Sequence, residues 1–133
     1  MSKIPVVIYD TSILILMMRE KVRVLDMVKN IVGTHIAAVP DLTLRELEKL
    51  SRSRERKTRI AASLALELAK KYMSVMKCRE NYCDECIFSA CACGVADYVV
   101  TCDIGLKKRL ESCGSCKILY YVESKRRIVG DVE

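Results

Sequence analysis

Residues 6–14 read VVIYDTSIL, and this stretch decides the fold. It lies within a continuous apolar run, Ile4–Tyr9, which is typical of a strand buried on both faces of a sheet. The next three residues, DTS at 10–12, are suited to cap a short helix over Ile13–Met18. A buried strand that leads directly into a helix predicts an α/β domain with a parallel sheet.

The same alternation of strand and helix continues along the rest of the chain. We expect helices over Val22–Val32, Asp41–Leu50, Thr58–Met73, Asp84–Cys93 and Asp103–Glu111, and strands over His35–Val39, Asp97–Thr101 and Lys117–Val122. This pattern predicts an α/β fold, a three-layer α/β/α sandwich with a central parallel sheet. We expect a single domain over residues 1–133, with its core at about 4–122 and a basic C-terminal tail at 123–133.

The composition is that of a globular protein with a basic surface. Of the 133 residues, 51% are apolar and 30% are charged, and the net charge is +6 with a pI near 8.9. A basic excess suits a polyanionic partner such as RNA, although ordinary soluble proteins can also be basic. The apolar run Ile4–Met18 is interrupted by Asp10 and is too short to span a bilayer, so we expect a cytoplasmic protein.

Two acids follow predicted strands directly. Asp10 ends the stretch VVIYD, and Asp103 lies just beyond the strand DYVVT at residues 97–101. Ligands bind at the carboxyl ends of strands in an open parallel sheet, so these two carboxylates can be neighbours in space. The alternative for each is an ordinary helix N-cap, which is a common place for aspartate after a strand.

Two further acids lie on helix faces that are otherwise apolar. Glu46 shares its face with Leu42 and Leu50, and Asp84 shares its face with Ile87, Phe88 and Cys91. Burying a lone carboxylate costs several kcal/mol unless a cation compensates it. That cation can be a lysine, an arginine or a metal ion, and the alternative is an acid at a helix end that reaches solvent.

The four acids together indicate a metal site. Clustered carboxylates repel one another, and a hard divalent cation such as Mg²⁺ or Mn²⁺ removes that repulsion. Such ions keep several waters, one of which can attack a phosphodiester. His35 is the only histidine and begins a predicted core strand, so RNA cleavage by paired histidines is excluded.

Four segments of the chain together resemble the PIN-domain nuclease family. They are VVIYDTSIL at 6–14, VPDLTLRELEKL at 39–50, CDECIF at 83–88 and VVTCDIGLKKRL at 99–110. The resemblance covers roughly residues 4–122. The strand KILYY at 117–121 and the basic segment ESKRRI at 123–128 are more similar to archaeal PIN proteins akin to the ribosomal-RNA-processing type than to the VapC toxins.

This resemblance implies a Mg²⁺- or Mn²⁺-dependent endoribonuclease that holds one or two ions and hydrolyses RNA with a metal-activated water. Its catalytic metal ligands would be Asp10, Glu46, Asp84 and Asp103, supported by the hydroxyl groups of Thr11 and Thr101. The family often has two adjacent aspartates where this chain has Asp84 and Glu85, so Glu85 is an alternative third ligand.

The same resemblance implies that RNA is the substrate and a partner. The RNA would be ribosomal in a processing enzyme, or the partner would be an antitoxin protein if the chain is a toxin. A homodimer is also expected in this family, and the apolar helix Ile13–Met18 can supply its interface. Alternative functions are a catalytically silent RNA-binding scaffold and a zinc-binding interaction module.

Basic residues gather in two places close to the predicted ligands. We expect contacts to the RNA backbone from Arg52, Arg54, Arg56, Lys57, Lys107 and Lys108. The alternative is an ordinary solvated helix face.

Eight cysteines are unusual in so small a chain. Cys83 and Cys86 form one C-x-x-C pair, and Cys113 and Cys116 form another. The two pairs can hold zinc, form disulfides or stay free, and we expect disulfides ahead of free thiols and zinc. We interpret three further cysteines as small side chains of the core: Cys91, Cys93 and Cys102.

Overall fold

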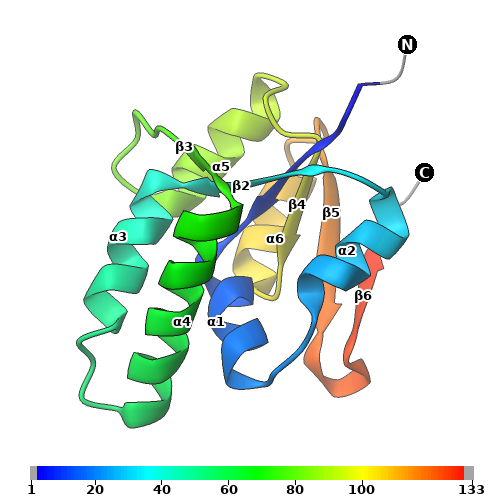
Figure 1. Cartoon of the computed structure of the whole chain (residues 1–133). Coiled ribbons are helices and arrows are strands. Elements are labelled where there is room, and N and C mark those ends of the chain that lie inside the picture. The colour runs from blue at the N-terminus through cyan, green and yellow to red at the C-terminus, as the bar shows by residue number, and fades with distance from the viewer. Residues whose placement is uncertain (1–2, 131–133) are drawn as a thin grey trace.

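The computed structural model describes residues 3–130, which form one six-stranded sheet (Figure 1). The strands are β1 (Val6–Tyr9), β2 (Ile36–Pro40), β3 (Ser74–Met76), β4 (Tyr98–Thr101), β5 (Lys117–Val122) and β6 (Arg127–Gly130). Their order across the sheet is β3-β2-β1-β4-β5-β6. Neighbouring strands are parallel except for β6, which runs antiparallel to β5.

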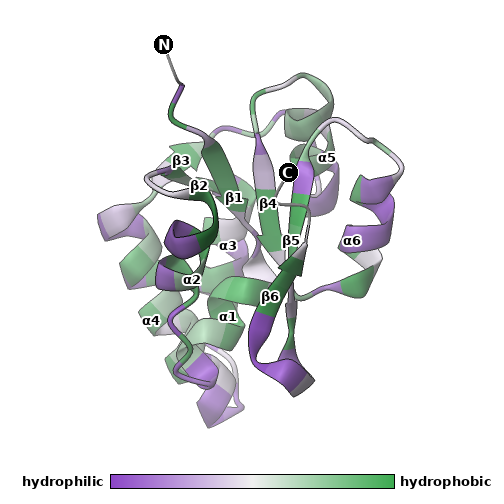
Figure 2. Ribbon diagram, turned by 90° about the vertical axis from the view of Figure 1, so that its right-hand side faces the viewer, coloured by the Kyte–Doolittle hydropathy of each residue, from purple (hydrophilic) through white to green (hydrophobic). Residues whose placement is uncertain are grey.

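Helices cover both faces of this sheet. They are α1 (Thr11–Arg19), α2 (Val24–Val32), α3 (Asp41–Leu50), α4 (Arg56–Tyr72), α5 (Cys83–Ala92), α6 (Ile104–Glu111) and the short 3-10 helix η1 (Glu123–Lys125). Figure 2 shows α1–α4 on one side of the strands and α5 and α6 on the other. The predicted α/β class and the three-layer arrangement are therefore confirmed, with β6 as an antiparallel addition.

The alternation of side chains along β1 explains why there are two cores. Val7 and Tyr9 join a large hydrophobic cluster with the helices on the α1 side, whereas Ile8 joins a smaller cluster with α5 and α6. All three side chains are fully buried, as expected for a central strand with helices on both faces.

The first helix is more deeply buried than the sequence analysis expected. Ile13, Leu14, Leu16 and Met17 are all buried in the large cluster of the chain's own core. Most of α1 is therefore committed to the core of one protomer, and Ile15 and Met18 are the apolar residues of this helix that are only partly buried.

Two edge strands were not expected from the sequence. The three residues of β3 follow directly on α4 and pair with β2. At the other edge, the segment expected as a basic tail turns back through η1 and the left-handed residue Arg126 (φ 50°), and then pairs with β5 as β6. A side chain at Gly130 would run into the Ile118 carbonyl, so glycine permits this close approach of the strands. Residues 131–133 of the expected tail lie outside the described residues.

The strands β3 and β6 lack the apolar sequence pattern of a buried strand, because an edge strand of three or four residues has little surface to bury.

No helix in the part of the chain described here is long and apolar enough to cross a membrane.

Candidate active site

The carboxyl ends of β1, β2 and β4 meet at one edge of the sheet, as expected for neighbouring parallel strands. A cleft of about 770 Å³ opens there. Its lining includes all five acids that the sequence analysis selected: Asp10, Glu46, Asp84, Glu85 and Asp103. The structure thus brings the predicted acids into one cleft, although they are far apart in the sequence.

Asp10 lies at the floor of the cleft and is only 5% exposed. Its Oδ1 accepts hydrogen bonds from the Ile13 amide (3.0 Å) and the Ser12 hydroxyl (2.8 Å), and its Oδ2 accepts one from Thr101 Oγ1 (2.7 Å). Burial raises the pKa of this carboxyl from 3.8 to about 6, and the charge of Asp103 adds to the rise. The hydrogen bonds favour the charged form but do not outweigh the loss of water.

Thr101 connects the two acids that follow strands. Its hydroxyl donates to Asp10 and accepts from the backbone amide of Asp103 at 2.9 Å. Asp103 in turn caps α6, since its Oδ1 accepts from the amides of Gly105 (2.8 Å) and Leu106 (3.2 Å). Both acids are helix N-caps, as the alternative interpretation had it, and they also share the cleft. The two roles are therefore compatible.

Glu46 is exposed, so the expected burial of this acid on an apolar stripe is wrong. The fully buried side of α3 is formed instead by Thr43 and Leu47. Two groups donate to Glu46 Oε1: Thr11 Oγ1 at 2.7 Å and Cys83 Sγ at 3.2 Å. These two contacts hold the carboxylate against the wall of the cleft.

Asp84 and Glu85 also line the cleft, in the first turn of α5, and both side chains are exposed. For Asp84 too, the expectation of a buried acid is wrong. The pKa of Asp84 is nevertheless raised, by partial burial first and then by the charges of Asp103 and Glu46, whereas Arg109 lowers it. Asp84 is therefore close enough to the other acids to interact with their charges.

The chemistry of the cleft fits a hard divalent cation. In residues 3–130, none of the five acids has a lysine or arginine nitrogen within 4.0 Å, so the buried charge of Asp10 has no cationic partner of its own. The side-chain donors to Glu46 and the backbone amides that donate to Asp103 reach only one carboxylate oxygen of each residue, which leaves the second oxygen for an ion. As the described side chains stand, however, no three His, Cys, Asp or Glu residues form a ready-made metal cluster.

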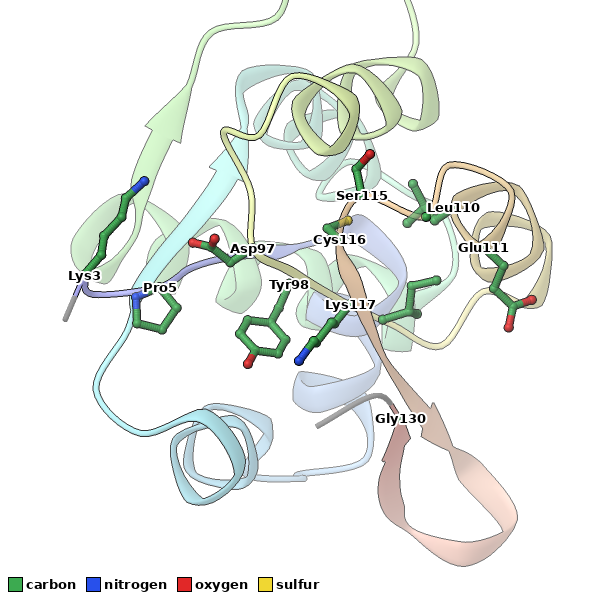
Figure 3. A pocket seen from close by; sticks show the side chains of 12 residues that line it. Lys3, Pro5, Asp97, Tyr98, Leu110, Glu111, Ser115, Cys116, Lys117 and Gly130 are labelled. Atoms are coloured by element: carbon green, nitrogen blue, oxygen red, sulfur yellow. The ribbon is translucent and has the colours of Figure 1, made fainter. Parts of the chain in front are cut away.

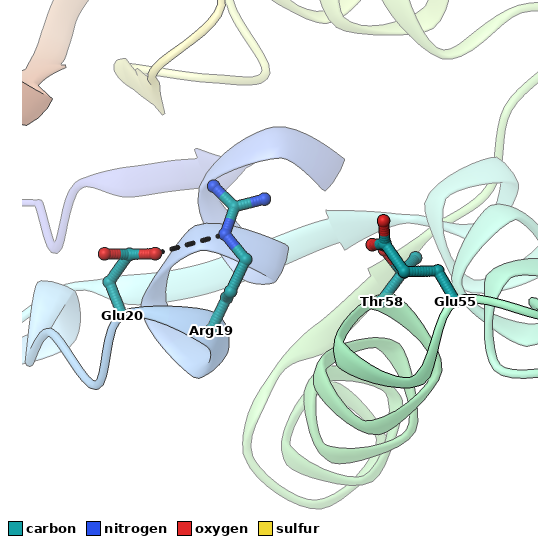
Figure 4. Close-up of polar contacts among 4 residues, drawn as sticks. All are labelled: Arg19, Glu20, Glu55 and Thr58. Atoms are coloured by element: carbon teal, nitrogen blue, oxygen red, sulfur yellow. Dashed lines mark hydrogen bonds and ion pairs between the residues drawn. The ribbon is translucent and has the colours of Figure 1, made fainter.

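Two arginines, Arg19 and Arg109, also line the cleft. The Arg19 Nε lies 3.2 Å from Glu20, so that charge is already compensated (Figure 4). Arg109 lies 5.4 Å from the centre of the Phe88 ring and faces the acids from α6. Further lining residues that the sequence analysis missed as site residues are Ser12, Ile15, Arg19, Leu50, Tyr82 and Glu123. Their apolar or isolated positions gave no signal before the chain was folded.

The predicted RNA-binding residues fall into two groups. Arg52 and Arg54 are exposed in the turn between α3 and α4, which begins just after the cleft residue Leu50, and Arg56 and Lys57 are exposed as the first two residues of α4. The α3–α4 turn is named here to include these first two residues of α4. Figure 4 shows Glu55 beside Thr58 at the start of α4, where the Thr58 hydroxyl donates to the Glu55 carboxylate. On α6, Lys107 is paired with Glu111 at 3.0 Å, and Lys108 is exposed.

The cysteines pair differently from the expectation. The disulfides are Cys78–Cys86 and Cys91–Cys116. Each C-x-x-C pair therefore contributes one cysteine to a different disulfide, while Cys83 and Cys113 remain free thiols, and the two pairs do not gather into one site. The interpretation of Cys91 as a simple core residue is wrong because it is bonded to Cys116, and Cys93 is exposed.

A second cavity of about 1020 Å³ lies at the opposite, amino edge of the sheet (Figure 3). It is lined by charges of both signs, from Lys3, Asp97, Glu111 and Lys117. The Asp97 side chain accepts a hydrogen bond from the Val6 amide at 2.8 Å, which ties the start of β1 to the start of β4. This cavity has no group of acids, so the smaller cleft is the candidate active site.

The fold and the cleft together define an α/β/α domain with an acidic site at the carboxyl edge of its sheet. The chain belongs to the PIN-like domain family, because the model of that family matches residues 7–120. The predicted family is therefore confirmed. Among solved structures, the chain is similar to the PIN domain endonuclease Utp24, with a TM-score of 0.77 at 23% identity, over 96% of this chain and 92% of that chain. At this identity the likeness shows the fold alone. No curated protein matches the chain.

Proposed function

We propose that this protein is a divalent-metal-dependent endoribonuclease whose active site is the acidic cleft. The observation that carries the proposal is the meeting of Asp10, Glu46, Asp84 and Asp103 at the carboxyl edge of a PIN-like fold. Membership of this family and the likeness to an endonuclease support a nuclease role. The proposed metal is Mg²⁺ or Mn²⁺, because all the proposed ligands are carboxylate oxygens.

The carboxylates of the proposed ligands are held in position to different extents. Asp10 is held by three donors and Asp103 by two backbone amides, so both carboxylates are positioned before any ligand arrives. Asp84 is exposed on α5, and Glu85 beside it remains an alternative ligand. When bound, a divalent ion would supply charge stabilisation and a reactive water. The chain's own residues bind that ion, orient it and provide the cation Arg109 beside the acids.

The positive charge near the cleft suits RNA as the substrate. In the described part of the chain, Arg52, Arg54, Arg56 and Lys57 form no ion pair within 4.0 Å, so they remain available for phosphates. Tyr82, which is 67% exposed at the cleft, offers a ring on which a base can stack. We propose that RNA crosses the cleft from the α3–α4 turn towards α5.

The test is cleavage of a labelled structured RNA by wild type and by Asp10→Asn, each with Mn²⁺, with Mg²⁺ and with EDTA. We expect cutting that requires a metal and that the variant loses, while circular dichroism shows the same fold for both proteins. The matched control is Asp26→Asn, which removes an exposed acid on α2 that is not among the residues lining the cleft. This variant should cut as wild type does.

A catalytically silent RNA-binding scaffold is the alternative outcome. It would show as tight RNA binding by well-folded wild type with no cleavage under any metal. Full activity of Asp10→Asn would instead contradict the proposed site. A ribosomal RNA substrate and an antitoxin partner are separate proposals. Identifying the RNA that cross-links to the protein in cells would distinguish them.

A further inference from the structure

The thiol of Cys83 lies between the two helices that carry Glu46 and Asp84. Cys83 is the first residue of α5 and directly precedes Asp84, and its half-buried side chain lines the cleft. Its Sγ donates to Glu46 Oε1 at 3.2 Å and lies 3.6 Å from Thr43 Oγ1, and both of these partners belong to α3. The thiol therefore joins α5 to α3 from inside the candidate site.

The contacts around Glu46 form one small network. Thr11 Oγ1 lies 2.7 Å from Glu46 Oε1 and 3.1 Å from Thr43 Oγ1, and Thr43 is fully buried. The donors from Thr11 and Cys83 both reach Oε1, so neither of them occupies Oε2. Glu46 is otherwise an exposed, flexible side chain, and ordering it costs rotamer entropy. Because two donors already hold Oε1 in the free protein, Glu46 loses less rotamer entropy when a metal ion binds.

We infer that Cys83 is a positioning residue, whose S–H holds Glu46 so that its second oxygen can receive the divalent cation of the site. The inference rests on the proposed function, since it assigns Cys83 to the orientation of one proposed metal ligand. Outer hydrogen-bond partners of this kind change metal affinity by about 10- to 100-fold when removed. A thiol is a weak donor, so the effect belongs at the lower end of that range.

The first experiment measures Mn²⁺ affinity of the whole chain by electron paramagnetic resonance, without RNA and without reliance on activity. Cys83→Ala should weaken binding about tenfold, whereas Cys83→Ser, which keeps a donor, should stay within about threefold of wild type. Cys83→Val also lacks a donor but keeps more of the side-chain volume, and it should lose as much as Cys83→Ala. If Cys83→Ala does not fold, Cys83→Val replaces it in this measurement.

The matched control is Cys93→Ala, because it removes an exposed free thiol immediately after the same helix and outside the cleft lining. It should bind Mn²⁺ as wild type does. Equal losses in Cys93→Ala and Cys83→Ala would overturn the inference, because the effect would then not depend on the contact with Glu46.

A double-mutant cycle separates positioning from a general effect on the fold. In a Glu46→Gln background, Cys83→Ala should cause no further loss of Mn²⁺ affinity, since the carboxylate that it positions is gone. A full additional loss in that background would overturn the inference. A Co²⁺ complex with a sulfur-to-metal charge-transfer band that Cys83→Ser lacks would also overturn it, because the thiol would then be a ligand.

The outcomes distinguish the inference from the function on which it rests. If wild type binds no Mn²⁺ under any condition, the proposed metal site fails and the inference fails with it. If wild type binds Mn²⁺, Glu46→Gln binds it more weakly and Cys83→Ala binds it as tightly as wild type, the proposed function stands and the inference alone is overturned.

Discussion

The two faces of the sheet are stabilised in different ways. Within residues 3–130, the cluster on the α1 side contains eighteen buried hydrophobic residues, and the cluster on the α5–α6 side contains ten. Both disulfides lie on the smaller side: Cys78–Cys86 ties α5 to the segment before it, and Cys91–Cys116 ties α5 to the start of β5. Cross-links thus support the side where less apolar surface is buried.

The candidate active site lies across this difference. Asp10 and Glu46 come from elements packed on the larger core, whereas Asp84 and Asp103 are at the starts of the helices over the smaller core. One half of the acid set is therefore carried by elements on the larger core, and the other half by helices over the smaller core, where both disulfides lie.

The largest effect is expected from the acids themselves. Asp10→Asn should lower the rate of RNA cleavage by about three orders of magnitude, which corresponds to about 4 kcal/mol of lost stabilisation. Asp84→Asn should lower it by about one to two orders, because Asp84 is exposed and Glu85 beside it can substitute in part. Single-turnover kinetics at saturating Mn²⁺ measures both. A larger loss for Asp84→Asn would reverse the proposed ranking of the two sides.

The disulfides should matter next, and mainly for one side of the molecule. Loop-closure entropy predicts that replacing Cys91 and Cys116 by serine lowers the free energy of unfolding by about 3.5 kcal/mol, and that replacing Cys78 and Cys86 lowers it by about 2.5 kcal/mol. Urea denaturation gives both values, and Cys93→Ser is the control. Hydrogen exchange should show faster opening of α5 and α6, while α1 and α4 keep their protection. A uniform loss of protection on both faces would show that the two cores are not separable.

The third effect is a pH dependence that arises from Asp10. Its pKa is about 6 in the folded protein and 3.8 as the ordinary value, so between pH 4 and pH 6 the folded state binds more protons than the unfolded state. The free energy of unfolding should therefore fall as the pH rises through this window. The fall amounts to about 3 kcal/mol, since one pKa unit corresponds to about 1.4 kcal/mol.

Denaturation in EDTA at a series of pH values measures this dependence, because a bound cation would cancel it. Asp10→Asn should lose this part of the slope and should be more stable than wild type at pH 7. Asp26→Asn, which changes an exposed acid, should keep the slope of wild type. An unchanged slope in Asp10→Asn would mean that the buried carboxyl is not the group that titrates.

Much of the fold was predictable because its signals are local. The apolar run before Asp10 identifies β1, and Asp10 and Asp103 cap α1 and α6 as their positions after strands indicated. The boundaries of β5 match the expectation residue for residue. The order of the acids along alternating strands and helices was also sufficient to expect them in one place, because parallel strands bring their carboxyl ends to the same edge.

What could not be predicted depends on contacts between distant segments. The periodicity of α3 placed Glu46 on an apolar stripe, but only the packing of α3 shows that Thr43 and Leu47 face the core and that Glu46 is exposed. The pairing of Cys91 with Cys116 follows from the approach of α5 to β5, and no C-x-x-C spacing encodes it. The contact of Cys83 with Glu46 likewise joins two residues 37 positions apart.

The smallest effect concerns which side of the cleft holds the RNA backbone. The basic residues of the α3–α4 turn have no carboxylate partner within 4.0 Å in the described chain, whereas Lys107 is paired with Glu111 and lies 5.7 Å from the centre of the Tyr120 ring. A lysine that already has a partner gains less from a phosphate than a solvated arginine does.

Arg54→Gln and Arg56→Gln together should therefore lower RNA affinity more than Lys107→Gln does. The double variant should also reduce the slope of log affinity against log salt by about one to two, since each phosphate contact contributes close to one. Fluorescence anisotropy with RNA and catalytically inactive Asp10→Asn at several salt concentrations measures both quantities. Equal effects of the double variant and of Lys107→Gln would mean that α6 shares the backbone contacts. The RNA would then be held by the disulfide-linked side as firmly as by the side with the larger core.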